Sequence, residues 1–282
     1  MKLSTITQED VNRLLPPRNP ETHKGDYGKI LLLCGSRGYT GAAALATMGA
    51  LRTGAGLVYL GVPESIYAIE ATKLTEPVIY PLPDKNGKLS CDSLREVLQL
   101  IEGKDAILIG PGLGQSQGTQ TITEAVLQYA SCPVVLDADG INVMNAHKDI
   151  LRGRTSPTIL TPHLGEFQRF AFPVNGNPTE AAIKLSLDLG VIVLLKGNRS
   201  VITDGKIVYI NSTGNPGMAT GGSGDILAGV ITSLLGQGIQ PLEAAAYGAW
   251  LHGAAGDLCA SEIGMYGMLP TDMLNALPRL LK

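Results

Sequence analysis

The chain has 282 residues, of which 44% are hydrophobic and 17% charged, and its formal net charge is −3. This composition is sufficient for a large buried core, and the slightly acidic balance argues against a nucleic-acid-binding protein. No apolar run reaches the length of a membrane span and the first residues lack a signal-peptide core, so we expect a cytoplasmic protein without a membrane partner. Four widely separated cysteines (Cys34, Cys91, Cys132 and Cys259) predict neither disulfides nor a structural zinc site.

Apolar strands alternate with helical segments along the whole chain. The first half predicts a helix capped by Thr7 and ended by Pro16-Pro17, a strand at 29–34, a helix at 41–52, strands at 57–62 and 77–83, a helix at 92–101, a strand at 105–110 and a helix at 120–130. The second half predicts strands at 133–137 and 158–160, a helix from its cap Thr179 to Leu189, a strand at 191–195, strands at 201–203 and 206–210 joined by a two-residue Asp204-Gly205 turn, and a helix at 242–263.

Strands that alternate with helices favour a single domain over residues 1–282, with a mostly parallel sheet covered by helices on both faces. In such folds, ligands bind beyond the carboxyl ends of the strands. Several of these ends carry small or polar residues: Gly35-Ser36, Gly112-Leu113-Gly114, Asp137-Ala138-Asp139, His163 and Lys196-Gly197-Asn198. Their convergence predicts a long cleft for one large ligand or for two ligands.

The most informative segment is the glycine-rich stretch 215–229, which leads into an apolar helical stripe from Ile226 to Leu235. Gly221, Gly222 and Gly224 allow the backbone to approach a ligand closely, and the helix that follows offers free N–H groups to an anion. Asp225 lies at the same helix start, where a carboxylate could accept a proton from a hydroxyl that attacks a phosphoryl group. The alternative is an ordinary helix entry with an acidic first turn.

Together, these residues resemble the ADP- or ATP-dependent NAD(P)H-hydrate dehydratases, which repair damaged nicotinamide nucleotides and have a ribokinase-like, three-layer α/β/α fold. The match runs from about residue 5 to the C-terminus. The chain departs from the usual family pattern at Gly140-Ile141 and at Leu164. The motifs that carry the resemblance are 23–29, 39–43, 52–58, 110–114, Asp137-Ala138-Asp139, Thr161-Pro162-His163, Lys196-Gly197 and 215–229.

The resemblance implies a specific reaction. The substrate is the S-epimer of hydrated NADH or NADPH (NADHX or NADPHX), which bears a hydroxyl at nicotinamide C6. ADP or ATP phosphorylates this hydroxyl, phosphate leaves, and NAD(P)H is restored; bacterial-type members use ADP and release AMP. The resemblance also implies Mg²⁺, a homotetramer, and functional pairing with a separate NAD(P)HX epimerase, because we expect no epimerase domain in this chain.

Site residues follow from the same motifs. Asp225 matches the catalytic aspartate, which orients and deprotonates the C6 hydroxyl. The residues expected to contact the hydrated dinucleotide are Ala43, Gly114, His163 and Asp225. The nucleotide is expected to bind at Lys196, Gly197, Asn198, Arg199, Ser200 and Gly224, with the backbone N–H groups of Gly222, Ser223 and Gly224 as an anion hole for the transferred phosphate.

Two further questions stay open in the sequence. Asp137, Asp139 and Asn142 are candidate ligands for Mg²⁺, but they are equally compatible with caps at a strand end. The alternative functions are a small-molecule kinase of the same fold, acting on a vitamin-precursor alcohol, and a non-catalytic nucleotide sensor. A Rossmann dehydrogenase is disfavoured because residues 34–39 lack Gly-x-Gly-x-x-Gly, and no Walker motif supports a P-loop mechanism.

Overall fold

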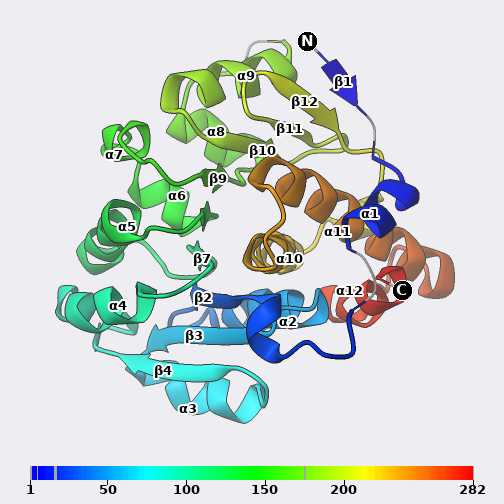
Figure 1. Cartoon of the computed structure of the whole chain (residues 1–282). Coiled ribbons are helices and arrows are strands. Elements are labelled where there is room, and N and C mark those ends of the chain that lie inside the picture. The colour runs from blue at the N-terminus through cyan, green and yellow to red at the C-terminus, as the bar shows by residue number, and fades with distance from the viewer. Residues whose placement is uncertain (1, 5, 16–17, 175, 282) are drawn as a thin grey trace.

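The centre of the protein is a ten-stranded sheet (Figure 1). The structure, a computed structural model, describes residues 2–4, 6–15, 18–174 and 176–281. The strands of the sheet are β1 (Lys2–Ser4), β2 (Lys29–Leu33), β3 (Leu57–Pro63), β4 (Val78–Leu82), β7 (Ala106–Ile109), β8 (Val134–Leu136), β9 (Thr158–Leu160), β10 (Ile192–Leu195), β11 (Val201–Thr203) and β12 (Ile207–Ile210). β5 (Asp84–Lys85) and β6 (Lys88–Leu89) form a separate two-stranded ribbon.

The sheet has the order β1-β12-β11-β10-β9-β8-β7-β2-β3-β4. All neighbouring pairs are parallel except β10–β11 and β11–β12, which confirms the predicted mostly parallel sheet. The predicted two-residue turn between β11 and β12 is wrong. Thr203 pairs with Val208, and the Asp204 carboxylate accepts hydrogen bonds from the Lys206 and Ile207 N–H groups at 2.9 and 2.8 Å, which stabilises a longer loop.

Helices cover both faces of the sheet, with α2, α10 and α11 on one face and α4, α5 and α9 on the other (Figure 1). The helices are α1 (Gln8–Leu14), α2 (Thr40–Arg52), α3 (Glu64–Lys73), α4 (Leu94–Ile101), α5 (Gln117–Tyr129), α6 (Asp139–Val143), α7 (Asp149–Arg152), α8 (Leu164–Phe170), α9 (Pro178–Leu189), α10 (Ser223–Gly236), α11 (Pro241–Ile263) and α12 (Pro270–Ala276). Within the described ranges, none of these helices is long and apolar enough to cross a membrane.

Alternate residues of the strands divide the core into two layers. On β2, Ile30 and Leu32 pack toward α2 and α10, whereas Leu31 and Leu33 pack toward α4 and α5. All four are fully buried, as the apolar run 29–34 predicts for a strand that is covered on both sides. The three-layer α/β/α architecture predicted from the sequence is confirmed.

Helix α10, which follows the glycine-rich stretch, lies deepest in the molecule. Every residue from Ile226 to Gly236 is buried, so this helix has no polar outer face and the apolar stripe seen in the sequence is only part of its buried surface. α10 packs tightly on α2, because a methyl group at Gly229 would clash with the Ala46 carbonyl and one at Gly49 would lie 2.7 Å from the Ile226 carbonyl oxygen. The glycines therefore fix the position of α10 against α2.

Several predicted helix boundaries need correction. Asn177, not Thr179, caps α9, because the Asn177 side chain accepts a hydrogen bond from the Thr179 N–H. α5 begins at Gln117, where Ser116 supplies the cap, rather than at residue 120. Thr7 caps α1 as predicted, but the predicted stop at Pro16-Pro17 lies outside the described residues. The sequence analysis did not predict α3, α6, α7, α8 or α12.

Candidate active site

The polar ends of three neighbouring strands meet at one edge of the sheet. Lys196 follows β10, His163 follows β9 and Asp137 follows β8, and the backbones of His163 and Lys196 form a parallel bridge. The start of α10 reaches the same edge, because the Lys196 ammonium nitrogen lies 3.4 Å from the position that a Gly224 Cβ would occupy. The structure thus brings together residues that are up to about 90 positions apart in the sequence, as the crevice rule for parallel sheets predicts.

A cavity of about 870 Å³ opens beside this edge, between the strand ends and the glycine-rich loop. Many predicted nucleotide-binding residues lie in its wall: Lys196, Gly197, Asn198, Ser200 and Gly224, together with His163 and Ser223. The described wall does not include Arg199, Gly222 or Asp225. The wall also contains apolar side chains, among them Leu227, Met218 and Ala249, so the cavity combines polar and apolar lining.

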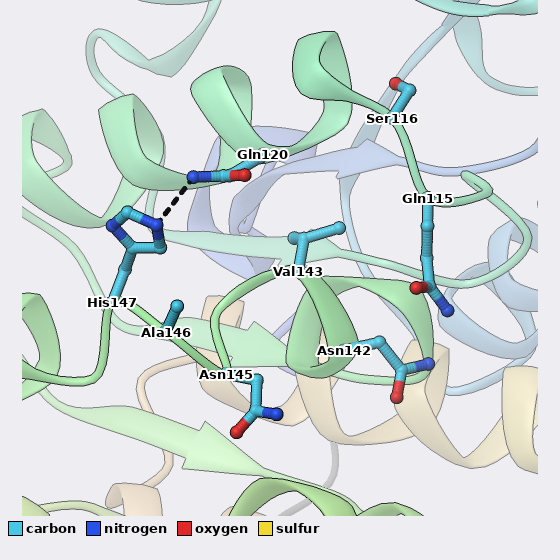
Figure 2. A pocket seen from close by; sticks show the side chains of 8 residues that line it. All are labelled: Gln115, Ser116, Gln120, Asn142, Val143, Asn145, Ala146 and His147. Carbon is cyan, nitrogen blue, oxygen red and sulfur yellow. Dashed lines mark hydrogen bonds between the residues drawn. The ribbon is translucent and has the colours of Figure 1, made fainter.

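A second cavity, of about 380 Å³, lies between the start of α5 and the segment that contains α6 (Figure 2). Its wall consists mainly of amide and imidazole side chains: Gln115, Gln120, Asn142, Asn145 and His147. Of these five residues, Asn142 was predicted from the sequence as a candidate Mg²⁺ ligand, and no function was predicted for the other four.

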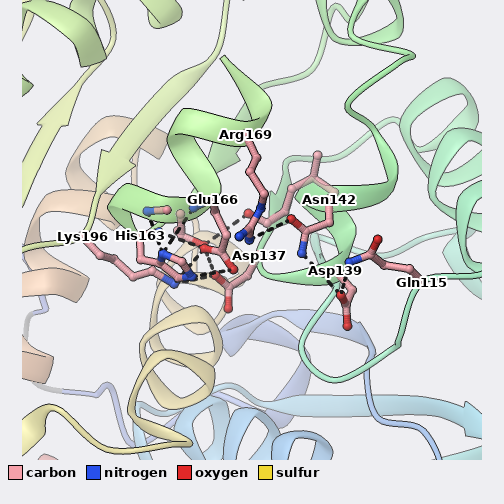
Figure 3. Close-up of polar contacts among 11 residues, drawn as sticks. Gln115, Asp137, Asp139, Asn142, His163, Glu166, Arg169 and Lys196 are labelled. Atoms are coloured by element: carbon pink, nitrogen blue, oxygen red, sulfur yellow. Dashed lines mark hydrogen bonds and ion pairs between the residues drawn. The ribbon is translucent and has the colours of Figure 1, made fainter. Parts of the chain in front are cut away.

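The two cavities are joined by a row of polar side chains along the sheet edge, from Lys196 and His163 past Asp137 to Asn142, Asp139 and Gln115 (Figure 3). The backbone of this row is strained at Ala138, a non-glycine residue with φ of +47° between the two aspartates. The close approach of Gly110 to the Asp137 carbonyl leaves no room for a side chain there. Such strain is typical of functional turns that hold two side chains in set directions.

The start of α10 has the properties of an anion site. Gly222 precedes the helix with φ of +97°, a left-handed conformation that suits only glycine. Among the described residues, the N–H groups of Gly222, Gly224 and Asp225 have no backbone acceptor, whereas the Ser223 N–H makes a long contact of 3.4 Å with the Thr220 carbonyl. Gly222 and Gly224 are therefore the better donors of the predicted anion hole.

Lys196 is held by acidic neighbours. Its ammonium donates a hydrogen bond of 2.9 Å to Asp137 Oδ1 and lies 4.0 Å from Glu166 Oε2, and its side chain is only 21% exposed. Burial disfavours the ammonium, but the charges of Asp137 and Glu166 outweigh it, so the pKa of Lys196 lies above its usual value. Lys196 is therefore a fixed cation in the wall of the large cavity.

Asp225 is the carboxylate with the proton affinity required of a general base. Burial raises its pKa, the nearby charge of Asp137 raises it further, and Lys196 lowers it, which gives a pKa of about 7. A group that titrates close to neutral pH can accept a proton and release it again under working conditions. Its position, one residue after Gly224, places it beside the anion site rather than inside the large cavity.

His163 has both a structural contact and an open face. Its Nδ1 accepts hydrogen bonds from the N–H groups of Gly165 and Glu166 at 3.0 and 3.3 Å, so it caps α8, while the His163 N–H donates to Glu166 Oε2 at 2.9 Å. The ring is about half exposed and lines the large cavity. Glu166 was missed in the sequence analysis, although the spacing His163…Glu166 is that of a capping box.

His252 was also missed. It is buried beneath the glycine-rich loop at the wall of the large cavity, where its Nε2 lies 2.8 Å from the Ser223 carbonyl oxygen and 3.3 Å from Ser223 Oγ. Burial lowers its pKa to about 4, so the neutral ring donates to the Ser223 carbonyl at physiological pH. His252 thus supports the start of α10 from below, a role that only the tertiary structure reveals.

The two small residues predicted to contact the dinucleotide differ in exposure. Gly114 is half-buried, and its N–H donates to Asp139 Oδ2 at 2.8 Å. Ala43 is fully buried, and its Cβ lies 2.8 Å from the position that a Cβ of Gly35 would occupy. Ala43 therefore packs directly against the turn at Gly35. Its predicted contact with substrate stays a prediction.

The carboxylates suggested for Mg²⁺ already have donors. Asp137 Oδ1 accepts from Lys196 and from the Thr161 hydroxyl at 2.8 Å, and Asp139 accepts from Gly114, Gln115 and Asn142. The described part of the chain contains no group of three metal-ligating side chains. Asp137 is paired with the Lys196 ammonium and both oxygens of Asp139 accept N–H groups, so these contacts do not fit a metal site built from the two carboxylates.

The fold and the site define a ribokinase-like protein with an anion-binding helix start, a fixed lysine and a buried aspartate at one end of a long cleft. The sequence profile of the NAD(P)H-hydrate dehydratase family matches residues 30–279. The chain therefore belongs to this family.

Individual relatives agree with this assignment. The ADP-dependent (S)-NAD(P)H-hydrate dehydratase of Bacillus subtilis is 38% identical over 100% of this chain and 99% of its own. A crystal structure of the ADP/ATP-dependent enzyme from the same organism, co-crystallised with ATP/Mg²⁺, superposes with a TM-score of 0.83 at 36% identity and covers 97% of this chain and 96% of its own. The bifunctional NAD(P)H-hydrate repair enzyme of Moorella thermoacetica is 44% identical over 95% of this chain, which spans about half (52%) of that relative's length.

Proposed function

We propose that this protein dehydrates the S-epimer of NADHX or NADPHX to NADH or NADPH, using ADP as phosphoryl donor and releasing AMP and phosphate. The observation that carries the proposal is the position of Asp225. A carboxylate with a pKa of about 7 follows the free N–H of Gly224, and the Lys196 ammonium lies beside the same glycine. Membership of the dehydratase family supports the same reaction.

The chemical logic begins with the leaving group. Hydroxide leaves poorly from C6, whereas phosphate leaves well. In the proposed first step, the C6 hydroxyl oxygen attacks the terminal phosphorus of the donor, the bond to the bridging oxygen breaks, and the hydroxyl proton passes to the Asp225 carboxylate. Phosphate then leaves C6 with the electrons of the broken C–O bond, the neighbouring ring carbon C5 loses a proton, and the C5–C6 double bond forms again.

The other residues bind and orient in this scheme. The N–H groups of Gly222 and Gly224 stabilise the transferred phosphoryl group, and the Lys196 ammonium offsets its negative charge. The stretch Gly197–Ser200 and the apolar side chains of the cavity wall accept the rest of the nucleotide. His163 also lines this cavity, and its half-exposed ring, whose Nε2 lies 3.4 Å from Glu166 Oε1, contacts the bound ligand.

Magnesium belongs to the proposal only as a companion of the nucleotide. Protein-bound Mg²⁺ commonly takes most of its ligands from phosphate oxygens and water, and the related B. subtilis structure was co-crystallised with ATP/Mg²⁺. A tetrameric assembly, a cytoplasmic location and pairing with a separate epimerase stay predictions. The bifunctional relatives are consistent with such a pairing.

The fate of the transferred phosphate tests the proposal against a kinase of the same fold. Purified protein is mixed with S-epimer NADHX and ADP labelled in its terminal phosphate, and the products are separated. We expect the label in free inorganic phosphate, with AMP and NADH formed in equal amounts. Label that accumulates in a stable phosphorylated product would indicate a kinase, and label that stays in ADP would contradict both enzymes.

A further inference from the structure

We propose that the 380 Å³ cavity between α5 and α6 binds the adenosine half of the dinucleotide substrate, and that Lys88 and Arg169 bind the pyrophosphate that joins the two halves. This inference rests on the proposed function, which supplies a dinucleotide as substrate. It assigns a role to a polar cavity that is separate from the nucleotide cavity and whose wall includes Asn142, a residue predicted from the sequence only as a candidate Mg²⁺ ligand.

The cavity continues the active-site cleft. Two of its wall residues, Gln115 and Asn142, are also the side chains that donate to Asp139 Oδ1, at 3.5 and 3.4 Å. The same aspartate accepts the N–H of Gly114 through its other oxygen, so one carboxylate connects the predicted substrate position with the cavity wall. Figure 3 shows these side chains at one end of the polar row and Lys196 at the other.

The cleft therefore has two ends with different functions. The ADP donor is expected at the Lys196 end, and Asp225 acts beside the same end. A substrate whose nicotinamide ring reacts at Asp225 must extend away from the occupied nucleotide cavity. The rest of the substrate can extend along the polar row, which leads to the small cavity (Figures 2 and 3). This part of the row consists of Asp137, Asp139, Asn142 and Gln115.

The wall chemistry suits a nucleoside. The side chains of Gln115, Asn142 and Asn145 offer both amide donors and amide acceptors (Figure 2). In the same wall, Gln120 and His147 form a hydrogen bond of 2.8 Å, and His147 Nδ1 lies 3.2 Å from Glu124, so these side chains have fixed positions. A volume of about 380 Å³ lies within the range of small-ligand sites.

Two cations contact residues of the cavity wall. The Lys88 ammonium donates to the Gln115 carbonyl at 3.2 Å, and its side chain lies against Gly114. The Arg169 guanidinium donates to Asn142 Oδ1 at 3.4 Å, a long contact that leaves its remaining N–H groups for a ligand. The charge of the nearby Asp139 is offset by its three N–H donors. Lysine and arginine side chains bind phosphate oxygens strongly, so these two cations suit the pyrophosphate bridge.

The test fills the cavity and compares whole and half substrates. Ala146→Trp places an indole in the cavity from an exposed wall position. Thr155→Trp is the matched control, because Thr155 is also exposed and lines a separate cavity of about 360 Å³ beside α7. Turnover is measured with S-epimer NADHX and with the hydrated form of reduced nicotinamide mononucleotide, which lacks the adenosine half.

We expect A146W to raise KM for NADHX by about tenfold or more, while kcat/KM for the mononucleotide and KM for ADP stay at the wild-type values. T155W should leave all of them unchanged. Equal loss with both substrates, or no loss with either, would overturn the proposal. The double change K88Q/R169Q should also raise KM for NADHX without changing kcat/KM for the mononucleotide. This increase in KM should be smaller at high salt.

Failure of the adenosine-site proposal can be distinguished from failure of the dehydratase proposal. If the wild-type protein turns over neither substrate, the dehydratase assignment fails, and calorimetric binding of NADH to the wild type, A146W and T155W decides the cavity assignment. Weaker binding to A146W alone would support the adenosine site. Equal binding to all three proteins, or no binding to any, would overturn it.

Discussion

The Lys196 ammonium donates a 2.9 Å hydrogen bond to Asp137 Oδ1, so the cation at the nucleotide cavity is anchored to a carboxylate that is almost completely buried. The same Asp137 charge raises the pKa of Asp225. One buried aspartate thus positions the predicted phosphate-binding lysine and adjusts the proton affinity of the predicted base.

Asp137→Asn tests this double role. Loss of the charge should lower the pKa of Asp225, so the acid limb of the kcat/KM profile, expected near pH 7 in the wild type, should move to lower pH. We also expect kcat to fall about tenfold because Lys196 loses its anchor. Thr161→Val is the control, since it removes the 2.8 Å hydrogen bond to Asp137 but keeps the charge, and its acid limb should stay in place. An unshifted limb in D137N would contradict the electrostatic link.

Asp225→Asn separates catalysis from folding. The substitution keeps the shape of the side chain but removes the base, so turnover should fall by about 10²–10⁴-fold. The raised pKa means that the folded protein holds a proton that the unfolded chain releases between about pH 4 and 7. The charged Asp225 therefore costs stability above pH 7.

We expect D225N to raise the free energy of unfolding by about 1–3 kcal/mol at pH 8 and to change it little at pH 4, measured by urea denaturation. A variant that is both inactive and less stable at pH 8 would indicate that Asp225 has a structural role. Normal turnover would remove it from the mechanism.

His252 should determine part of the acid sensitivity of the fold. Its pKa falls from 6.5 to about 4 on burial, so the unfolded chain binds a proton between these values and the folded protein does not. The contribution of neutral His252 to stability should therefore be fully present above pH 6.5. The free energy of unfolding should then decrease by up to about 3 kcal/mol as the pH falls to 4. His252→Gln, which retains an N–H for the Ser223 carbonyl, should show a smaller decline. His23→Gln changes an exposed histidine and should behave like the wild type; an identical pH slope in H252Q would contradict the account.

Two glycines of the same loop should respond differently to alanine. Gly222 has φ of +97° and a methyl group there would clash with Leu45, so Gly222→Ala should destabilise the protein by about 1–2 kcal/mol. Gly224 lies inside α10, and its methyl group would meet only Lys196 Nζ at 3.4 Å, so Gly224→Ala should fold normally. G224A should nevertheless bind ADP at least about tenfold more weakly, because the methyl group occupies the phosphate position. Thermal melting with and without ADP measures both effects, and normal ADP binding by G224A would exclude Gly224 from the nucleotide site.

The sequence predicted the parts of the fold that depend on local pattern. Continuous apolar strands such as 29–34 and 191–195 were recognised because both faces of a parallel strand are buried. Short helices such as α6 and α8 were not predicted, since they depend on the turn at Ala138 and on the His163 cap rather than on apolar periodicity.

The strand ends and the glycine-rich loop predicted where the candidate active site lies, but they did not predict which side chains contact one another there. Nothing in the sequence pairs Asp137 with Lys196, because 59 positions separate them and only the order of β8, β9 and β10 brings them together. His252 likewise acquires its contact with Ser223 only through the packing of α11 on α10. The polar cavity beside α6 has no local sequence signature at all.

The central claim is that this protein restores NAD(P)H from its hydrate, and a turnover assay tests it most directly. Wild-type protein is mixed with S-epimer NADHX and Mg²⁺, with ADP or ATP in parallel, and the absorbance of reduced nicotinamide is followed. The account predicts recovery with ADP, with AMP and free phosphate as products, and none for D225N. Recovery with ATP alone would keep the reaction and contradict the donor. No recovery with either nucleotide, from protein whose melting temperature still rises with ADP, would contradict the dehydratase assignment.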